Sequence, residues 1–414
     1  MKENKNVPKL RFNEFKDEWL EYKLGDIAKI QRGASPRPIN DKKWYDFEDK
    51  KVGWVRISDV TKSSKYLQET EDYFSSEGIK KSRFLPKGNL IMSICATIGK
   101  PIITDIDTCI HDGFVGFSDL NKINKEFLYY ILDILEEKFC SLSQTGSQAN
   151  LNSDLIRKTK VFVPSSSEQE KIVNFLSLVD KKIELMKRKL SLYQSLEKYF
   201  SNVLFSEKTR FPNNQNNNFS DWENYTLNNL GKTYTGLSGK SKEDFGKGKM
   251  YITYKSIFDN TTINTDKLDL VNISKDEKQN KVKFGDLFFT TSSETPEEVG
   301  MASVLLKNLD ECYLNSFCFG YRLNSTKIIN PLFMSYYLRS YIIRKKIMVL
   351  AQGSTRFNLS KNELMKLNIK IPCFEEQEKI ADFLLNFNSK INNIQNEIQI
   401  IAQYKKGLLQ QMFI

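Results

Sequence analysis

The feature that most constrains this fold is a short segment, in which polar residues precede apolar ones, that occurs twice in the sequence. "SSEQEKIVNFL" occupies residues 166–176, and "FEEQEKIADFL" occupies residues 374–384, 208 residues later. A repeat on this scale has to be settled before any single motif is interpreted, because it defines the unit that folds. The sequence therefore predicts two tandem copies of one structural unit.

Each copy continues as a run of apolar residues at alternating steps of four and three. The first run is Ile172, Leu176, Val179, Ile183, Met186, Leu190 and Tyr193, and the second is Ile380, Leu384, Phe387, Ile391, Ile394, Ile398 and Ile401. Such steps are typical of coiled-coil helices. No Gly or Pro interrupts 165–206 or 374–406, so each helix can run for about 30 to 40 residues, roughly 45 to 57 Å. Two amphipathic helices on separate cores are the alternative.

The repeat also extends into the segments before the helices. Residues 9–33 return as 208–236 with an Asn-rich insertion, "FLYYIL" (127–132) returns as "FMSYYL" (333–338), and 86–101 matches 283–300 more loosely. The matched pairs are Arg11 with Arg210, Phe12 with Phe211, Trp19 with Trp222, Leu24 with Leu227 and Gly33 with Gly236. We therefore expect four parts: a globule at 1–164, a helix at 165–206, a second globule at 207–372 and a second helix at 373–414.

Within each globule the pattern is typical of an α+β fold. Helices are expected near 125–140 and 331–350. Short β-branched and aromatic runs between Gly, Pro and Asp turns predict strands, namely 53–60, 89–94, 112–117, 249–257, 286–291 and 317–323. The loops 35–51 and 238–249 share charge but not residues. The frame is repeated, whereas the exposed basic loops are not.

The short link between the two copies favours an antiparallel helix pair. Only two or three residues separate the end of the first helix near Phe205 from the second copy at Lys208, so the second globule must begin at the far end of that helix. Two like units then pack most easily about a pseudo-two-fold axis. Duplex DNA has similar symmetry, and half-sites about 34 Å apart suit two heads on such a spacer. Because the loops differ, we expect a split, asymmetric target.

Composition agrees with a polyanionic partner and a reducing compartment. The 414 residues carry a formal charge of +11, and the pI is near 9.0, which favours nucleic acid over an acidic small molecule. The six cysteines contain no CxxC, which is typical of reduced thiols in a cytoplasmic protein. With neither a signal peptide nor a 20-residue apolar run, no membrane anchor is expected.

Catalytic motifs are weak. "NPLF" (330–333) resembles part of an aminomethyltransferase motif, but no glycine-rich turn accompanies it, and Asn330 before Pro331 is typical of a helix start. "YTGLSGKS" (234–241) lacks the first Gly of a phosphate loop. The sole histidine, His111, has no nucleophile motif beside it and is interpreted as structural. The pair Glu136 and Lys138 has a spacing that arises by chance in a chain this rich in charge.

Taken together, the residues resemble the specificity subunit of type I restriction-modification systems. The resemblance covers essentially the whole chain and is carried by the "EQEKI" helix starts, the "GS...NL" turns before "VFVP" and "IKIP", and "KGNLIMSICATIG" (87–99). In the second globule only Gly285, Asp286, Leu287 and Gly300 of that last stretch remain.

The resemblance implies a non-catalytic subunit whose two globules are target-recognition domains, each reading one half of a bipartite double-stranded DNA sequence. It further implies two modification subunits that use S-adenosylmethionine and two ATP- and Mg-dependent restriction subunits, with no cofactor in this chain and no metal.

Two sets of site residues follow. Basic residues on turn-rich loops are candidates for DNA phosphates or guanine edges, with Arg37 and Lys240 placed in recognition loops: Arg32, Arg37, Lys42, Lys43, Lys62, Lys100, Lys240, Lys242, Lys249, Lys255 and Arg356. The polar helix starts are candidates for partner subunits, with helix capping as the alternative for the first Glu of each: Glu168, Gln169, Glu170, Glu376, Gln377 and Glu378. No catalytic residue is expected.

Two other functional classes stay open. An autonomous DNA-binding or scaffold protein would need no methylase partner, and a self-sufficient nuclease would cut DNA in a metal-dependent way. The sequence discloses neither the target bases nor the gap length, and it does not say whether a restriction subunit is present.

Overall fold

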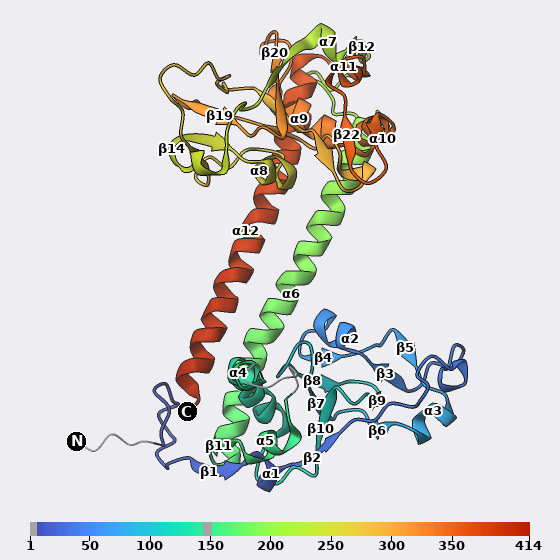
Figure 1. Ribbon diagram of the computed structural model, residues 1–414, viewed down its shortest axis with the longest axis vertical. Helices are drawn as coiled ribbons and strands as arrows, with labels where there is room; N and C mark the ends of the chain where they lie inside the picture. The colour runs from blue at the N-terminus through green and yellow to red at the C-terminus, as the bar shows by residue number, and fades with distance from the viewer. Residues whose placement is uncertain (1–5, 144–150) are drawn as a thin grey trace, which may run out of the picture. The chain divides into compact units, whose positions relative to one another are not determined.

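The computed structural model describes residues 6–143 and 151–414, which divide into two compact units. Unit 1 comprises Met1–Lys187 and Glu397–Ile414, and unit 2 comprises Arg188–Asn396. Each unit holds one globule together with parts of two long helices, α6 (Ser166–Phe205) and α12 (Phe374–Met412) (Figure 1). The four-part domain division drawn from the sequence stays a prediction.

Unit 1 is built on two small sheets. The first has the order β2-β10-β7-β8-β4, with bounds Lys29–Arg32, Phe114–Ser118, Leu90–Ser93, Pro101–Thr104 and Tyr66–Leu67. The second has the order β5-β3-β9-β6, with bounds Asp72–Tyr73, Gly53–Val55, Thr108–Ile110 and Arg83–Leu85. A further pair joins β1 (Leu20–Lys23) to β11 (Lys160–Val163). The helices are α1 (Leu24–Ile27), η1 (Lys42–Trp44), α2 (Ile57–Lys62), α3 (Ser76–Lys80), α4 (Lys125–Ser143) and α5 (Ser153–Lys158).

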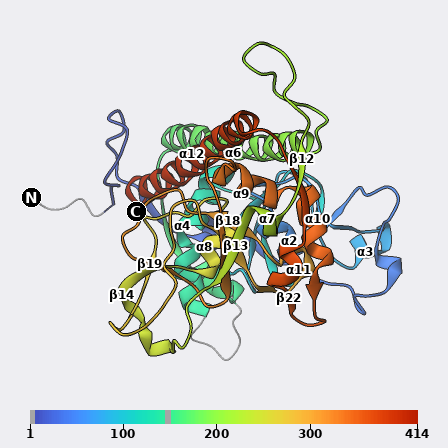
Figure 2. The same cartoon turned by 90° about the horizontal axis from the view of Figure 1, so that it is seen from above.

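Unit 2 has two corresponding sheets, each with one strand fewer, and adds one hairpin. Its first sheet has the order β13-β20-β16-β18 (Gly231–Thr235, Cys318–Leu323, Leu287–Thr290, Ala302–Val304), and its second the order β15-β14-β19 (Asp269–Val271, Phe245–Ile252, Cys312–Leu314). The strand β12 (Glu223–Thr226) pairs with β23 (Asn368–Ile371), and β17 (Ser292–Ser293) joins the hairpin of β21 (Ala351–Gln352) and β22 (Phe357–Leu359). The helices are α7 (Leu227–Leu230), η2 (Lys242–Asp244), α8 (Tyr254–Asp259), η3 (Pro296–Glu298), α9 (Pro331–Arg339), α10 (Tyr341–Val349) and α11 (Lys361–Met365). Helix α9 packs beside β18 (Figure 2).

The strand registers confirm the internal repeat. In unit 1 Ile91 faces Gly116 across an antiparallel pair, and in unit 2 Phe288 faces Gly320 in the same way. The one parallel pair of each second sheet also recurs, between β3 and β9 in unit 1 and between β14 and β19 in unit 2. The loosely matched stretches 86–101 and 283–300 also have turns at equivalent glycines. Gly88 and Gly99 have positive φ angles, and so do their counterparts Gly285 and Gly300, a conformation that favours glycine.

Two sequence predictions need correction. The runs 53–60 and 249–257 are not single strands, because β3 and β14 end at Val55 and Ile252, and the short helices α2 and α8 follow. The predicted helix near 331–350 is two helices, since Ser340 adopts an extended conformation (φ −63°, ψ 151°) between α9 and α10. The bend directs two half-buried arginines, Arg339 and Arg344, onto backbone carbonyls of the neighbouring turns, including Ile257 O and Gly300 O.

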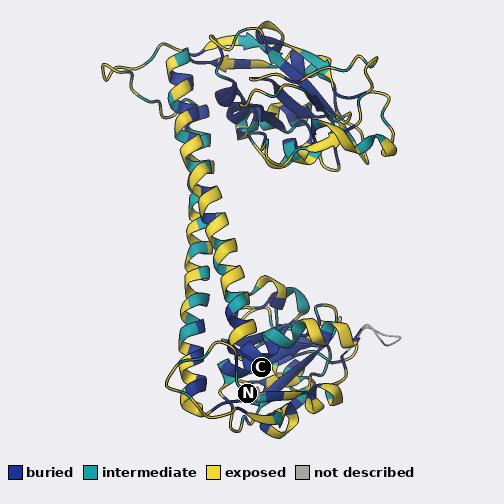
Figure 3. Ribbon diagram, turned by 90° about the vertical axis from the view of Figure 1, so that its left-hand side faces the viewer, coloured by how far each residue is buried: buried dark blue, intermediate teal, exposed yellow. Residues whose placement is uncertain are grey.

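The antiparallel helix pair is confirmed in each unit separately. In unit 1 the beginning of α6 packs on the end of α12, with Leu176 and Met412 in one core and Asp180 2.8 Å from Lys405. In unit 2 the end of α6 packs on the beginning of α12, where the Phe200 and Phe383 rings lie 5.2 Å apart. The strands are mostly buried, whereas much of the helix surface is exposed (Figure 3). Heptad-spaced apolar side chains stabilise such pairs by interlocking along the seam.

Candidate nucleic-acid interface

Four of the basic residues predicted in unit 1 lie close together in sequence on one exposed loop and its flanks. Arg32 ends β2 and donates to the Asp112 carbonyl at 2.6 Å. Arg37, Lys42 and Lys43 are exposed on the following loop, and Lys43 pairs with Asp41 at 3.0 Å. The loop is anchored by Trp44, which is buried and donates from Nε1 to the Pro38 carbonyl at 2.9 Å. A rigid base under an exposed basic loop suits DNA contact, and for these four residues that contact stays a prediction.

The other two predicted residues of unit 1 lie apart from this loop. Lys62 is exposed at the end of α2. Lys100 is half-buried and borders a hollow of about 630 Å³ that Lys65, Lys181 and Lys405 also line. In this hollow the Lys65 ammonium is buried and held by Glu126 at 2.7 Å, so the basic character of the hollow is partly neutralised within the chain.

In unit 2 internal carboxylates hold three of the five predicted residues. The Lys240 side chain is only 5% exposed and pairs with Glu277 at 2.6 Å, so its contact with DNA would require this pair to open. Lys249 pairs with Glu311 at 2.6 Å, and Lys255 pairs with Asp259 at 2.7 Å. Hydrogen bonds from Lys249, Lys281 and Tyr313 lower the pKa of Glu311 to about 2. Lys242 and Arg356 are exposed. For all five, contact with DNA stays a prediction.

The first Glu of each "EQEK" segment forms a buried ion pair. Arg11 donates from Nε and Nη2 to the two carboxylate oxygens of Glu168, at 2.7 and 2.8 Å. Arg210 does the same to Glu376, at 3.0 and 2.6 Å, and Trp222 Nε1 adds a third bond at 3.2 Å. The hydrogen bond with Glu168 raises the pKa of Arg11, and that with Glu376 raises the pKa of Arg210. Each pair ties the segment that opens its globule to the start of a long helix.

The Gln of each segment completes the joint. Gln169 Oε1 accepts from the Asn124 backbone at 2.7 Å, and its Nε2 donates to the Lys122 and Pro164 carbonyls. Gln377 repeats all three contacts, with Asn330, Ile328 and Pro372. We call each set of Arg, Glu and Gln contacts a helix joint. These residues were predicted to lie at a partner surface. The helix joint itself was not predicted, because Arg11 is 157 residues from Glu168 in the chain. The repeat of Arg11 as Arg210 was the sequence signal that could have indicated a shared structural contact.

The burial of these side chains changes where a partner surface would lie. Glu168, Gln169, Glu376 and Gln377 are at most 1% exposed, so their polar groups are used inside the chain. Glu170 and Glu378 are exposed. Partner contact stays a prediction for all six, and these last two carry the accessible carboxylates.

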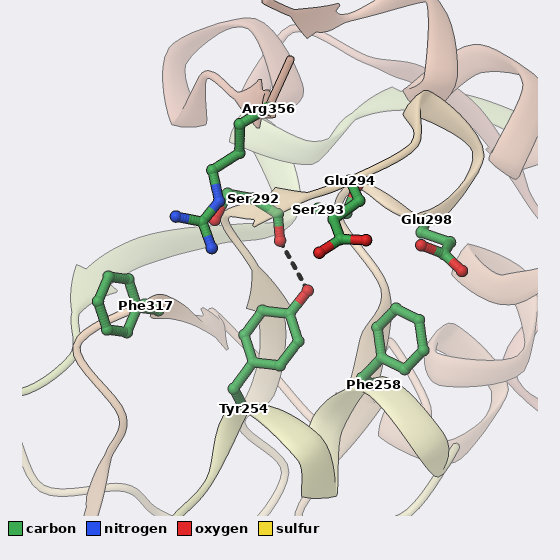
Figure 4. A pocket seen from close by; sticks show the side chains of 8 residues that line it. All are labelled: Tyr254, Phe258, Ser292, Ser293, Glu294, Glu298, Phe317 and Arg356. Atoms are coloured by element: carbon green, nitrogen blue, oxygen red, sulfur yellow. Dashed lines mark hydrogen bonds between the residues drawn. The ribbon is translucent and has the colours of Figure 1, made fainter. Parts of the chain in front are cut away.

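Unit 2 has a pocket of about 360 Å³ that the sequence did not reveal (Figure 4). Three aromatic residues, one arginine and two glutamates line it beside β17: Tyr254, Phe258, Phe317, Arg356, Glu294 and Glu298. The Tyr254 hydroxyl donates to the Ser292 carbonyl at 2.6 Å, and the Tyr254 and Phe258 rings stack at 5.9 Å. These residues come from helix α8, the segment from β17 through η3, the β19–β20 turn and the β21–β22 hairpin, so no single sequence motif marks them.

Local geometry gives the weak catalytic candidates structural roles. His111 accepts the Gly113 N–H through Nδ1 at 2.8 Å and packs on the Phe114 ring. Burial lowers the pKa of His111 and raises the pKa of the neighbouring Cys95 thiol. Asn330 accepts two backbone N–H groups of α9 as its N-cap, with Pro331 at the first helical position, as predicted. Among the described residues no group of three or more His, Cys, Asp or Glu is arranged to hold a metal ion.

Comparison with known proteins decides the family. The family model described as "Type I restriction modification DNA specificity domain" matches residues 16–192 and again 219–403. The chain belongs to the type I restriction-modification DNA specificity family. As the resemblance implied, the family's domain occurs twice, once for each copy of the repeat.

Curated relatives and solved structures agree with this assignment. The type I restriction enzyme MjaIX specificity subunit of Methanocaldococcus jannaschii is 21% identical over 95% of this chain and 92% of its own length. The EcoR124I/EcoR124II specificity subunit of Escherichia coli is 22% identical over 49% of this chain and 54% of its own. A crystal structure of a type I S subunit from M. genitalium has a TM-score of 0.59 at 14% identity and covers 99% of both chains. The structural likeness shows a shared fold. Within the described residues of this specificity-family chain, no helix is long and apolar enough to cross a membrane.

Proposed function

We propose that this chain is the DNA-recognition subunit of a type I restriction-modification assembly and reads a split, asymmetric duplex target, one half-site per unit. One observation carries the proposal: the same frame occurs twice in one chain, joined in the same way to two antiparallel helices. The two helix joints share the same Arg–Glu and Gln–backbone contacts. The loops that differ between the copies are where the two half-sites would be distinguished.

The helices set the gap between half-sites in this proposal. An α-helix rises about 1.5 Å per residue, and α6 and α12 contain 40 and 39 residues. Because the two lengths match and the pair is antiparallel within both units, the helices suit a spacer.

Modification subunits dock on the helices and globules in the same proposal, two for each chain. The surface of α6 supports this. Four large apolar side chains stay exposed at seven-residue steps, which place them on one stripe of the helix. We call it the α6 stripe, and its members are Leu178 (67% exposed), Leu185 (54%), Leu192 (58%) and Tyr199 (60%). Lys181, Lys182 and Lys189 are exposed along its flank. An amphipathic partner helix with acidic flanks would complement this stripe in shape and charge.

Catalysis belongs to the partners in this proposal. S-adenosylmethionine would be bound by the modification subunits, and ATP and Mg by the two restriction subunits. The chain itself contributes recognition and spacing. The structural roles of His111 and Asn330 within the chain support this division. In the same proposal the protein acts in the cytoplasm, together with the DNA.

The test is to coexpress the chain with neighbouring methyltransferase genes. We expect a complex of two modification subunits and one such chain, and loss of a split methyladenine motif from long-read maps when this gene is deleted. An autonomous DNA-binding protein would purify alone and leave the methylation map unchanged. A self-sufficient nuclease would cut DNA with a divalent metal in the absence of any partner.

A further inference from the structure

We propose that the pocket of unit 2 around Phe317 and Arg356 reads base edges of one half-site, with guanine as the base that Arg356 selects. This inference rests on the proposed function and adds the residues that would determine specificity in unit 2. The pocket is about 360 Å³ and opens between the Arg356 guanidinium and the rings of Tyr254 and Phe317 (Figure 4). Arginine recognises guanine by donating two hydrogen bonds to O6 and N7.

The pocket presents Phe317 on a fixed turn. The Phe317 side chain is 63% exposed, so its ring is accessible to a ligand. Its carbonyl accepts from Thr291 twice, from the backbone N–H at 3.1 Å and from Oγ1 at 2.5 Å. Its own N–H donates to Asn315 Oδ1 at 2.9 Å. Because the backbone of this turn is already fixed, the ring costs little further backbone entropy when it meets a base face or a thymine methyl group.

Arg356 is presented by a tight hairpin. It precedes β22, which pairs with β17 in the register Ser293 to Phe357. The turn depends on Gly353, whose φ is +127° and whose position leaves no room for a side chain, because a Cβ there would lie 2.1 Å from the Arg356 carbonyl. The hairpin therefore fixes the backbone of Arg356 while its side chain stays exposed.

The charge of the lining favours a base over a backbone phosphate. Arg356 contributes one positive charge, whereas Glu294 and Glu298 contribute two negative charges. A lining with net negative charge repels phosphate oxygens. Carboxylates instead accept hydrogen bonds from the N4 amino group of cytosine, which is the partner of guanine in a base pair. Arginine together with a nearby glutamate thus matches the donor and acceptor pattern of one G·C pair.

Unit 1 differs from unit 2 at the position of the Phe317 ring. The strand registers align Tyr254 with Ile57 and Phe317 with Gly113. A Cβ on Gly113 would lie 2.4 Å from both Cys95 Sγ and His111 Cε1, so unit 1 has no space for a side chain where unit 2 exposes an aromatic ring. The Phe317 ring therefore has no counterpart at the aligned position among the described residues of unit 1. A feature found in only one of two repeated units is what reading a second, different half-site requires.

The test is a selection of duplexes from a random-sequence library by the full chain together with the subunits that copurify with it. Wild type is expected to enrich a split motif. Arg356→Ala should lose its preference for guanine at one position of one half-site by about tenfold to a hundredfold and leave the other half-site unchanged. Phe317→Ala should weaken preference at the same or the adjacent position. The matched control is Lys366→Ala, which removes an exposed cation of the same unit outside the pocket.

Each outcome decides a separate point. A wild-type selection without a split motif would overturn the proposed function and this assignment with it. A split motif that Arg356→Ala leaves unchanged would overturn the pocket assignment alone. Equal weakening on all sequences, with a smaller salt dependence, would make Arg356 a phosphate contact and also overturn it. If the Ala variants do not fold, Arg356→Lys keeps the charge and removes the two-bond geometry, and the same loss of guanine preference is expected.

Discussion

Arg11 and Glu168 are 157 residues apart in the chain, yet they form a two-bond ion pair in which the Glu168 side chain is only 1% exposed. Arg210 and Glu376 repeat the pair in the other unit. Because a carboxylate loses most of its hydration at such a site, the guanidinium has to replace it. The helix joint is therefore the element that fixes each globule to its helix start.

Removing the arginine alone should be costly. Arg11→Ala leaves the Glu168 carboxylate buried without its partner, and we expect unfolding free energy to fall by about 3 to 5 kcal/mol. Arg210→Ala should behave alike. Urea unfolding followed by circular dichroism measures both. The control is Lys51→Ala, whose pair with Asp49 is exposed and should change stability by less than about 1 kcal/mol. A loss for Arg11→Ala no larger than for this control would show that the joint does not hold the unit together.

The only histidine should make stability fall in mild acid. Burial lowers the pKa of His111 in the folded protein, so the unfolded chain binds the proton more tightly. His111 therefore opposes folding once the pH drops below its unfolded pKa, about 6.5. We expect a lower urea midpoint at pH 5.5 than at pH 7.5.

A matched variant separates the contribution of His111 to the pH dependence of stability from that of the carboxylates. His111→Asn introduces the residue that unit 2 has at the aligned position, Asn315. The variant should lose part of the difference between the two pH values. An unchanged difference would assign the pH dependence to other groups.

The α6 stripe should bind partners without contributing to folding. Leu185→Asp places a charge on an exposed position, so it should leave the thermal unfolding temperature nearly unchanged while reducing copurification of modification subunits at least several-fold. Asn393→Asp is the matched control, because it alters the equivalent position of α12, 208 residues later, which is already polar. Equal copurification by the two variants would contradict docking on the α6 stripe.

Gly407 offers a stabilising change. It lies inside α12, and a Cβ there would meet no atom within 4 Å. Glycine in a helix interior costs about 0.5 to 1 kcal/mol relative to alanine, so Gly407→Ala should raise the unfolding free energy by about that amount. Differential scanning calorimetry of the two proteins would measure the gain, and a lower melting temperature would show that the helix needs flexibility or a close approach at this position.

The heptad periodicity predicted the two long helices, whereas contacts between residues far apart in the sequence could not be predicted from it. The heptad steps of residues such as Leu176 and Leu384 are a property of neighbours in sequence, and the antiparallel arrangement followed from the short link near Phe205. The burial of Lys240 depends on Glu277, 37 residues away, and no local pattern encodes it. The short helix α2 follows β3 within a run that has the pattern of one strand, because the Asp59 carboxylate accepts the Arg56 backbone N–H at 2.8 Å and caps the start of the helix.

The candidate site shows the same limit. Exposure of Arg37 and Lys42 was predictable from a charged, turn-rich loop. The pocket around Phe317 was not, since four distant segments form it and a strand signal placed Phe317 inside a run at 317–323. The polar helix starts were recognised as special, but only the folded chain shows that the first Glu and the Gln of each face inward.

The most direct test of the account shortens both helices by one heptad. Deleting residues 184–190 and 393–399 keeps the seam in phase and should bring the half-sites closer by about 10 Å, or about three base pairs. The control replaces the same residues with a foreign heptad of equal length. Long-read mapping of methylated adenines should show the same two half-sites with a gap about three base pairs shorter for the deletion and an unchanged gap for the control. An active deletion variant that methylates sites with the original gap would contradict the claim that the helices measure the distance between half-sites.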